Sequence, residues 1–244
     1  MNAPRFYVPL PLAPGSRIDL PDAAAGHVAR VLRMQVGDAV TLFDGAGGEH
    51  AGTLLRVARN GVTVQVAEWN AVDRESPLDV TLIQALATGD KMDWIVQKAV
   101  ELGVTRICPV VMRRSVLRLE GERAEKRVAH WQAIAAGACE QSGRNRVPKI
   151  EAVAPMAKFF DPPPALSGIA LLPGEGTPLP KLEPPGGPVA LAVGPEGGYA
   201  DEEIAILRRA QFRFVTIGPR VLRTETAGMA ALAALQALWG DWKS

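Results

Sequence analysis

The segment with the most chemically capable side chains is 218–228, GPRVLRTETAG. A Gly-Pro pair, two arginines and a Thr-Glu-Thr run directly precede an Ala- and Leu-rich stretch with the composition of a buried helix. An arginine can stabilise a developing anion through charge-assisted hydrogen bonds, and a glutamate can accept a proton. The same position suits Thr224 as a helix cap and Glu225 as a first-turn residue stabilised by the helix dipole. The segment therefore has both a catalytic and a folding interpretation.

Three predicted strands end in loops rich in glycine and proline, and 218–228 lies in the last of them. The loops are LLPGEG (171–176), AVGPEGG (192–198) and TIGPRVLRTET (216–226). Glycine lets a ligand approach the backbone closely, and proline fixes the loop shape. Ligands of open α/β sheets bind beyond the carboxyl ends of the strands. We expect one composite pocket, although each loop alone also fits a simple tight turn.

The sequence lacks the residue patterns of several common chemistries. It has no GxxxxGK[ST] motif, and GAGGEH at 45–50 lacks the third glycine of a dinucleotide motif and joins two predicted strands. The histidines form no recognisable triad with Ser or Cys, and there is no HExxH motif. Cys108 and Cys139 lie in apolar segments, which predicts buried thiols and no metal site. What remains suits a nucleoside-like cofactor and catalysis by positioning.

The first part of the chain has the pattern of a small β-rich domain. Residues 39–45, 51–57 and 61–69 alternate apolar and polar side chains and are separated by turn sequences. The period of 21–34 predicts a helix with Val28, Val31 and Leu32 on one face. A small barrel with one helix fits this pattern. The segment 70–77 is polar, ends in proline and precedes a change in the sequence pattern. We therefore place a domain boundary near 73–77.

From residue 78 onward predicted strands and helices alternate, which is typical of a largely parallel sheet covered by helices on both faces. The Pro/Gly-rich segments 161–168 and 173–188 are expected to be surface loops. The strands are expected at 79–86, 104–111, 168–173, 188–193 and 212–220, and the helices at 90–102, 120–142, 201–211 and 224–239.

Composition and charge limit the class of protein. The chain has 244 residues, 48% apolar content and a formal net charge of +1, which excludes a surface coated with basic residues. Residues 113–149 nevertheless contain nine Lys or Arg against four Glu, which fits either phosphate contact or a solvated helix with internal ion pairs. The longest apolar run, 227–239, is shorter than the roughly 20 residues of a membrane span. With no secretion signal visible, we expect a cytoplasmic protein without a membrane segment.

Seven segments closely resemble the RsmE family of bacterial methyltransferases, members of the SPOUT superfamily that modify N3 of one uridine in 16S ribosomal RNA. The segments occur in the order of the family and span nearly the whole chain, and the resemblance is weakest at 151–188. They are RFYV at 5–8, HVARVLRMQVGD at 27–38, GDKMDWIVQKAVELGV at 89–104, RRSV at 113–116, ACEQSGRNRVPKI at 138–150, LAVGPEGG at 191–198 and IGPRVLRTETAGMAAL at 217–232.

The resemblance implies a homodimer with two domains per chain. Residues 1–73 would form a PUA-like β-barrel that helps to hold RNA. Residues 77–244 would form a SPOUT α/β domain with a parallel sheet and a trefoil knot that binds S-adenosylmethionine. The implied partner is 16S ribosomal RNA or the small ribosomal subunit, and no metal is required.

The resemblance also implies roles for single residues. Arg223 and Arg5, the latter from the partner subunit, would stabilise the uridine anion, and Glu225 fits either a base or a helix-terminal residue. The cofactor site would comprise Leu172, Pro173, Gly194, Pro195, Glu196, Gly197, Ile217, Gly218, Leu222, Arg223 and Thr224. The RNA-binding residues would be Arg5, Arg30, Arg33, Arg113, Arg114, Arg118, Arg144, Arg146 and Lys149.

Two other functions compete with this interpretation. One is a ribosome-assembly factor that binds RNA without catalysis, and the other is a SPOUT methyltransferase acting on transfer RNA or on a ribose 2′-OH. The segments GPEGG and LRTETA argue against the first, because a pure binding protein needs no cofactor pocket. RFYV together with EQSGRNRVPKI argues against the second. Free RNA and an assembled subunit both stay open as substrates.

Overall fold

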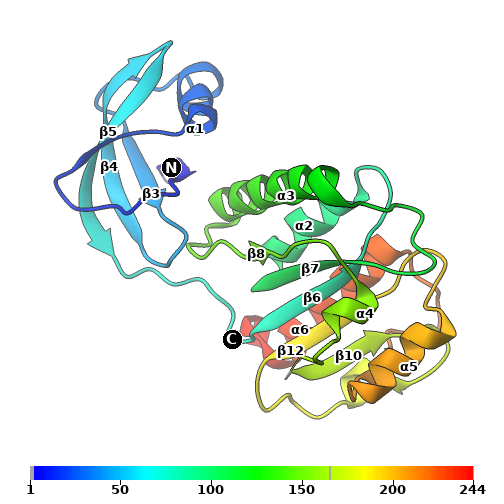
Figure 1. The fold of residues 1–244 in the computed structure, drawn as a ribbon. Coiled ribbons are helices and arrows are strands. Elements are labelled where there is room, and N and C mark those ends of the chain that lie inside the picture. The colour runs from blue at the N-terminus through cyan, green and yellow to red at the C-terminus, as the bar shows by residue number, and fades with distance from the viewer. Residues whose placement is uncertain (1–2, 165, 244) are drawn as a thin grey trace. The chain divides into compact units, whose positions relative to one another are not determined.

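The chain folds into two compact units in a computed structural model that describes residues 3–164 and 166–243 (Figure 1). The first unit is made of two stretches of the chain, the residues up to Glu75 and Ala136–Val147. The second unit comprises the remaining residues. The division after Glu75 lies inside the interval 73–77 in which the sequence placed a boundary. The membership of Ala136–Val147 in the first unit is not foreseeable from local sequence patterns, because it depends on contacts between distant residues.

The first unit is a five-stranded sheet in the order β1-β3-β4-β5-β2. Strand β1 pairs with β3 in parallel, and the other pairs are antiparallel. A cluster of buried Val, Leu, Ala and Phe side chains forms its core. The strands are β1 (Arg5–Tyr7), β2 (Arg17–Asp19), β3 (Ala39–Phe43), β4 (Glu49–Ala58) and β5 (Gly61–Asn70).

The expected helix at 21–34 is shorter than predicted and changes its type. An α-helical turn, α1 (Asp22–Gly26), continues into a π-helix over His27–Val31, in which Leu32 N donates to His27 O. The wider turn of a π-helix rotates later residues away from the face that a 3.6-residue period predicts. Val28 is buried, but Val31 is 69% exposed, so the predicted apolar face was wrong beyond Val28.

Charged hydrogen bonds tie Ala136–Val147 to the rest of the first unit. Arg144 is 4% exposed, and its Nε lies 3.0 Å from Glu75 Oε2, with a further contact from its terminal nitrogen to the same carboxylate. The backbone N–H of Tyr7 donates to Glu140 Oε1 at 2.8 Å. Arg74 Nη1 donates to Gly143 O at 3.0 Å. These contacts hold a segment distant in sequence against the first sheet.

The second unit is an eight-stranded parallel sheet in the order β11-β13-β10-β12-β6-β7-β8, with β9 also paired to β7. Its α/β alternation confirms the fold class expected from the sequence. The strands are β6 (Val80–Ala85), β7 (Arg106–Val111), β8 (Lys149–Ile150), β9 (Ala154–Pro155), β10 (Ser167–Leu171), β11 (Thr177–Pro178), β12 (Val189–Val193) and β13 (Arg213–Thr216).

Helices cover both faces of this sheet (Figure 1). Alternate residues of β6, β7, β10 and β12 share one buried cluster with α4 and α5, whereas α2 and α6 pack against each other and α6 packs on β12. The expected helix at 224–239 is confirmed with the same bounds. The helices are α2 (Lys91–Glu101), α3 (Gly121–Ser142), α4 (Met156–Phe159), α5 (Asp201–Arg209) and α6 (Thr224–Trp239), with 3₁₀ turns at Leu179–Lys181 and Asp241–Lys243.

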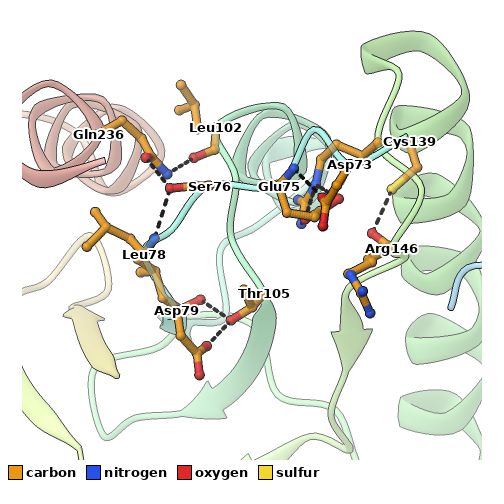
Figure 2. A network of polar contacts seen from close by, with 12 residues as sticks. Asp73, Glu75, Ser76, Leu78, Asp79, Leu102, Thr105, Cys139, Arg146 and Gln236 are labelled. Carbon is orange, nitrogen blue, oxygen red and sulfur yellow. Dashed lines mark hydrogen bonds and ion pairs between the residues drawn. The ribbon is translucent and has the colours of Figure 1, made fainter. Parts of the chain in front are cut away.

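Polar contacts anchor the start of the second unit to its last helix (Figure 2). Ser76 Oγ donates to Gln236 Oε1 at 2.6 Å, and Leu78 N donates to Ser76 Oγ at 3.1 Å. Gln236 Nε2 in turn donates to Leu102 O at 2.9 Å. Gln236 is 1% exposed, so these bonds satisfy a buried amide inside the otherwise apolar packing of α6.

The segment 173–188 is not the simple surface loop that its composition suggested. Strand β11 lies within it and pairs with β13, and Leu179 is 1% exposed. Gly176 permits this pairing, because a Cβ at that position would lie 2.3 Å from Phe214 O. A glycine at a close backbone approach explains why a Gly/Pro-rich segment can still add a strand to the sheet.

Replacement of Arg144 by Met should destabilise the protein by roughly 2–4 kcal/mol, because it leaves the Glu75 carboxylate partly buried without its partner. Urea unfolding measures the change. Lys149→Met is the control, since the Lys149 side chain is exposed and its pair with Glu151 should contribute less than about 1 kcal/mol. An Arg144→Met protein as stable as the wild type would contradict a structural role for this arginine.

Candidate functional site

The three Gly/Pro-rich loops meet at one cavity of about 550 Å³ at the carboxyl ends of β10 and β12. This confirms the composite pocket expected from the sequence, and its volume lies in the usual range of ligand sites. A depression of about 700 Å³ near the amino ends of these strands is larger, but ligands of such sheets bind at the carboxyl ends. The cavity is lined by Leu171–Pro173, Val193–Tyr199, Val221–Thr224 and Ala227.

The pocket wall combines apolar side chains with exposed backbone. Leu171, Leu172, Val193 and Leu222 supply apolar surface, which suits the enclosure of a purine ring. Gly198 has a φ of +70°, a conformation that favours glycine, and nothing lies within 4 Å of the position where a Cβ would be. The backbone at Glu196–Gly198, whose residues are exposed, is therefore accessible to a ligand.

Tyr199 was not predicted as a site residue. It lines the cavity, is 6% exposed, and its hydroxyl is buried without a hydrogen-bond partner among the described residues. Burial raises the pKa of this phenol far above its usual value, so the hydroxyl keeps its proton. A buried polar group without a partner at a pocket wall fits a site that is completed by a polar ligand. The residues present therefore fit a nucleoside-like group such as S-adenosylmethionine.

A buried chain of hydrogen bonds links two of the pocket loops. Gln84 Nε2 donates to Thr224 Oγ1 at 3.1 Å, and Thr224 Oγ1 donates to Gly194 O at 2.7 Å. The expectation that Thr224 caps α6 was wrong. Arg223 occupies the cap position, no side chain caps this helix, and the Thr224 hydroxyl bonds the neighbouring loop instead. Gln84 was also missed, although a glutamine inside a buried strand is a visible signal.

Lys91 lies between two carboxylates at this site. Its Nζ is 3.1 Å from Glu196 Oε1 and 3.5 Å from Glu225 Oε2. The hydrogen bond to Glu196 and the charges of both carboxylates raise the pKa of Lys91. Burial alone would raise the pKa of Glu196, but hydrogen bonds from its own backbone N–H and from Lys91 outweigh burial and lower it. The site therefore holds a charged lysine and an ionised Glu196.

Arg223 lines the cavity and is exposed, and its guanidinium has no hydrogen bond or ion pair within the described part of the chain. It is therefore available to a ligand at the pocket mouth. Ile217 and Gly218, predicted to contact the cofactor, do not line the cavity. They precede it in the loop between β13 and α6, and the chain reaches the cavity only at Val221.

Comparison with known proteins gives the family. A family model described as an RNA methyltransferase domain matches residues 74–236, and one described as an RNA methyltransferase PUA domain matches residues 20–67. The ribosomal RNA small subunit methyltransferase E of Bacillus subtilis is 32% identical over 86% of this chain and 85% of its own. The chain belongs to the ribosomal RNA small subunit methyltransferase E family. Membership confirms the RsmE resemblance and the SPOUT fold class with its N-terminal PUA domain.

Two solved structures of similar proteins agree with the fold. A ribosomal RNA small subunit methyltransferase E from Neisseria gonorrhoeae, solved bound to S-adenosyl methionine, has a TM-score of 0.93 and 42% identity and covers 99% of this chain and 100% of its own. A protein from Legionella pneumophila, solved with the same cofactor, has a TM-score of 0.92 and 38% identity over 99% of this chain.

Eight of the nine residues expected to bind RNA, all except Arg5, fall into three groups. Arg30 and Arg33 are exposed in the first unit of this methyltransferase and have no ion pair within the described residues. Arg144 is buried against Glu75, so its placement gives no support to RNA contact. The remaining exposed members already have internal partners: Arg113 pairs with Glu202, Arg114 with Gly197 O, Arg118 with Arg113 O, Arg146 with Ala46 O and Lys149 with Glu151.

Arg5 also lies in the first unit, where its guanidinium contacts the side chains of Glu49 and Asn145 and lies 5.0 Å from the Phe43 ring centroid. Its side chain is 14% exposed. These contacts satisfy much of the hydrogen-bonding capacity of the guanidinium. They indicate a role in packing the first unit, and they give no support to the predicted catalytic role.

Both cysteines of this methyltransferase are free and buried, as predicted. Burial raises the pKa of the Cys108 thiol to about 11 and that of Cys139 to about 12, so neither is a thiolate nucleophile near neutral pH. No group of three or more His, Cys, Asp or Glu in the described residues could hold a metal ion. Within the same residues, no helix has the length and apolar character of a membrane span.

We predict that Glu225→Gln retains methyl transfer within about threefold, because Lys91 already engages this carboxylate. A general base would contribute on the order of 100-fold or more. The rate should be measured across pH, with Glu101→Gln as a control from the partly buried Lys98–Glu101 pair, which does not line the cavity. A loss of two orders of magnitude for Glu225→Gln, with cofactor binding intact, would establish Glu225 as the base.

Proposed function

We propose that this protein transfers the methyl group of S-adenosylmethionine to N3 of one uridine in 16S ribosomal RNA. The observation that carries the proposal is the pocket itself, two of whose three loops, at 193–198 and 221–224, belong to the segments that resemble the family. The Neisseria gonorrhoeae relative, whose structure matches this one over 99% of the chain, was solved bound to S-adenosyl methionine, which supports the same cofactor here. Family membership supports ribosomal RNA of the small subunit as the substrate.

The proposed cofactor contacts follow from the lining of the cavity. Leu172 and Leu222 enclose the base, and the exposed backbone of Glu196–Gly198 supplies hydrogen-bonding groups. Tyr199 offers its hydroxyl to a polar group of the ligand. The cofactor supplies an electrophilic methyl group when it is bound. No charged side chain has to recognise the adenine, because N–H and C=O groups of the loop can do so.

Methylation at N3 requires loss of the N3 proton, since the lone pair of a neutral imide is delocalised over its two carbonyl groups. Negative charge then develops on the uracil ring and its carbonyl oxygens. Arg223 at the pocket mouth stabilises this charge through charge-assisted hydrogen bonds. The reaction needs no covalent intermediate with a cysteine, which agrees with two buried, protonated thiols.

We further propose a homodimer that binds RNA through exposed arginines. Arg30 and Arg33 in the first unit and Arg113, Arg114 and Arg118 in the second have exposed side chains that can reach phosphates. Exposed ion pairs such as Arg113–Glu202 contribute little to stability, so exchange of the carboxylate for a phosphate costs little. A ribosomal substrate implies a cytoplasmic location in a bacterium.

The function is tested with labelled S-adenosylmethionine and ribosomal particles from a strain without this activity. Small subunits and free 16S ribosomal RNA serve as separate substrates, and the modified nucleoside is mapped by mass spectrometry. We expect one 3-methyluridine in 16S ribosomal RNA. A methylated ribose or a modified transfer RNA would indicate a different SPOUT activity, and RNA binding without methylation would indicate an assembly factor.

Arg223→Ala should reduce methyl transfer by about 100-fold or more while changing cofactor affinity less than about threefold, because the guanidinium acts on charge that develops on the uracil. Turnover and cofactor binding are measured separately, the latter by calorimetry. Arg220→Ala is the control, since Arg220 is an exposed arginine of the same loop that does not line the cavity. Normal turnover in Arg223→Ala would contradict the proposed role.

A further inference from the structure

We propose that Gln84 is a positioning residue of the cofactor pocket, which holds Thr224 and, through it, the carbonyl of Gly194 in the geometry that binds the cofactor. The inference rests on the proposed function, because it assigns a purpose to a residue that does not itself line the cavity. The inference concerns the hydrogen-bonded link between two pocket loops. Neither the apolar pattern of β6 nor the segments that resemble the family give Gln84 this role.

Gln84 is an anomaly in its strand. All six residues of β6 are buried, and Gln84 is 0% exposed in the middle of the sheet, opposite Val193 of β12 and Pro109 of β7. Central strands of parallel sheets are normally near-continuous apolar runs, because both faces are covered. Burial of an amide costs free energy that hydrogen bonds only partly return. A residue type that is unfavourable for folding at this position calls for another explanation.

The hydrogen bonds of Gln84 determine which atom donates and which accepts at each step from Gln84 through Thr224 to Gly194. Its Nε2 donates to Ala85 O at 3.0 Å and to Thr224 Oγ1 at 3.1 Å. A flipped amide would place its oxygen against the Ala85 carbonyl oxygen, so this orientation is the favourable one. Since Thr224 Oγ1 accepts from Gln84, its single proton is directed at Gly194 O, 2.7 Å away.

This chain joins parts of the site that are far apart in the sequence. Gly194 begins the loop after β12, and Thr224 begins α6 after the loop that contains Leu222 and Arg223. Both loops line the cavity, and their spacing sets its width. A fixed hydrogen bond between them prepares the pocket for its ligand, which reduces the ordering cost of binding.

The other polar atom of the side chain argues against a role in stability alone. Gln84 Oε1 is buried without a hydrogen-bond partner among the described residues. A residue selected only for stability would not leave a buried acceptor unsatisfied, because an apolar side chain of the same size avoids that cost. The interpretation as a positioning residue and the interpretation as a structural residue therefore predict opposite changes in stability upon substitution.

The test is Gln84→Met, which conserves the length of the side chain and removes both polar atoms. We expect an unfolding midpoint equal to or above that of the wild type, and a dissociation constant for S-adenosylmethionine that is raised about tenfold in calorimetry. The KM for the cofactor should rise, with kcat changed less. Thr81→Val is the matched control, because Thr81 is a buried polar residue at the other end of β6, where it contacts Arg106. It should leave cofactor affinity unchanged.

A double-mutant cycle with Thr224 separates positioning from general damage. Thr224→Val should weaken cofactor binding, Thr224→Ser should preserve it, and Gln84→Met combined with Thr224→Val should be no weaker than the worse single variant. These measurements keep the proposal testable even if Gln84→Met folds poorly.

The outcomes distinguish this inference from the proposed function. A wild-type protein that binds S-adenosylmethionine, together with a Gln84→Met variant that binds equally well, overturns the role of Gln84 alone. Lower stability of Gln84→Met with unchanged affinity does the same, since it reveals a structural residue. A wild-type protein that binds no S-adenosylmethionine overturns the proposed function and this role together.

Discussion

The parallel hydrogen bonding of β12 between β10 and β6 is the constraint on which the site depends. The sequence VALAV is fully buried, and its register sets Ala190 beside Gly168 on one side and Thr81 on the other. Because these strands run in the same direction, their carboxyl ends emerge at one edge of the sheet. The loops that follow β10 and β12 meet there with the loop that leads into α6, and they enclose a cavity without any long insertion.

The pocket combines backbone accessibility with a small number of polar ties. Apolar side chains and loop backbone form most of the lining, in which Glu196 and Arg223 are the charged residues. Lys91 links α2, the loop after β12 and the first turn of α6 by charge. The bond from Thr224 to Gly194 links two of the same elements inside the protein. A binding site made of loops can thus have fixed dimensions, because its loops are tied both inside the protein and at its surface.

Basic residues of similar sequence context can have different roles, some in stabilising the fold and others in the proposed binding of RNA. The arginines of the segment 138–150 look alike in sequence, yet Arg144 is buried against Glu75 while Arg146 is exposed. A buried guanidinium with two hydrogen bonds to one carboxylate is committed to structure. Only exposed arginines, with weak internal partners or none, can exchange those partners for phosphates at low cost.

The sequence by itself determined the α/β class, the bounds of α6 and the three loops that form the pocket, because apolar periodicity and Gly/Pro positions are local signals. It also gave the buried state of Cys108 and Cys139. Tertiary structure decided the rest: the π-helical turn at His27–Val31, the edge strand at Thr177–Pro178 and the inward placement of Arg144. It alone revealed that Thr224 bonds Gly194 and Gln84 and does not cap its helix. The edge strand, the burial of Arg144 and the bonds of Thr224 each depend on a partner distant in the chain. The π-helical turn depends on a small difference in free energy between α- and π-helical hydrogen bonding. A local sequence pattern encodes neither kind of information.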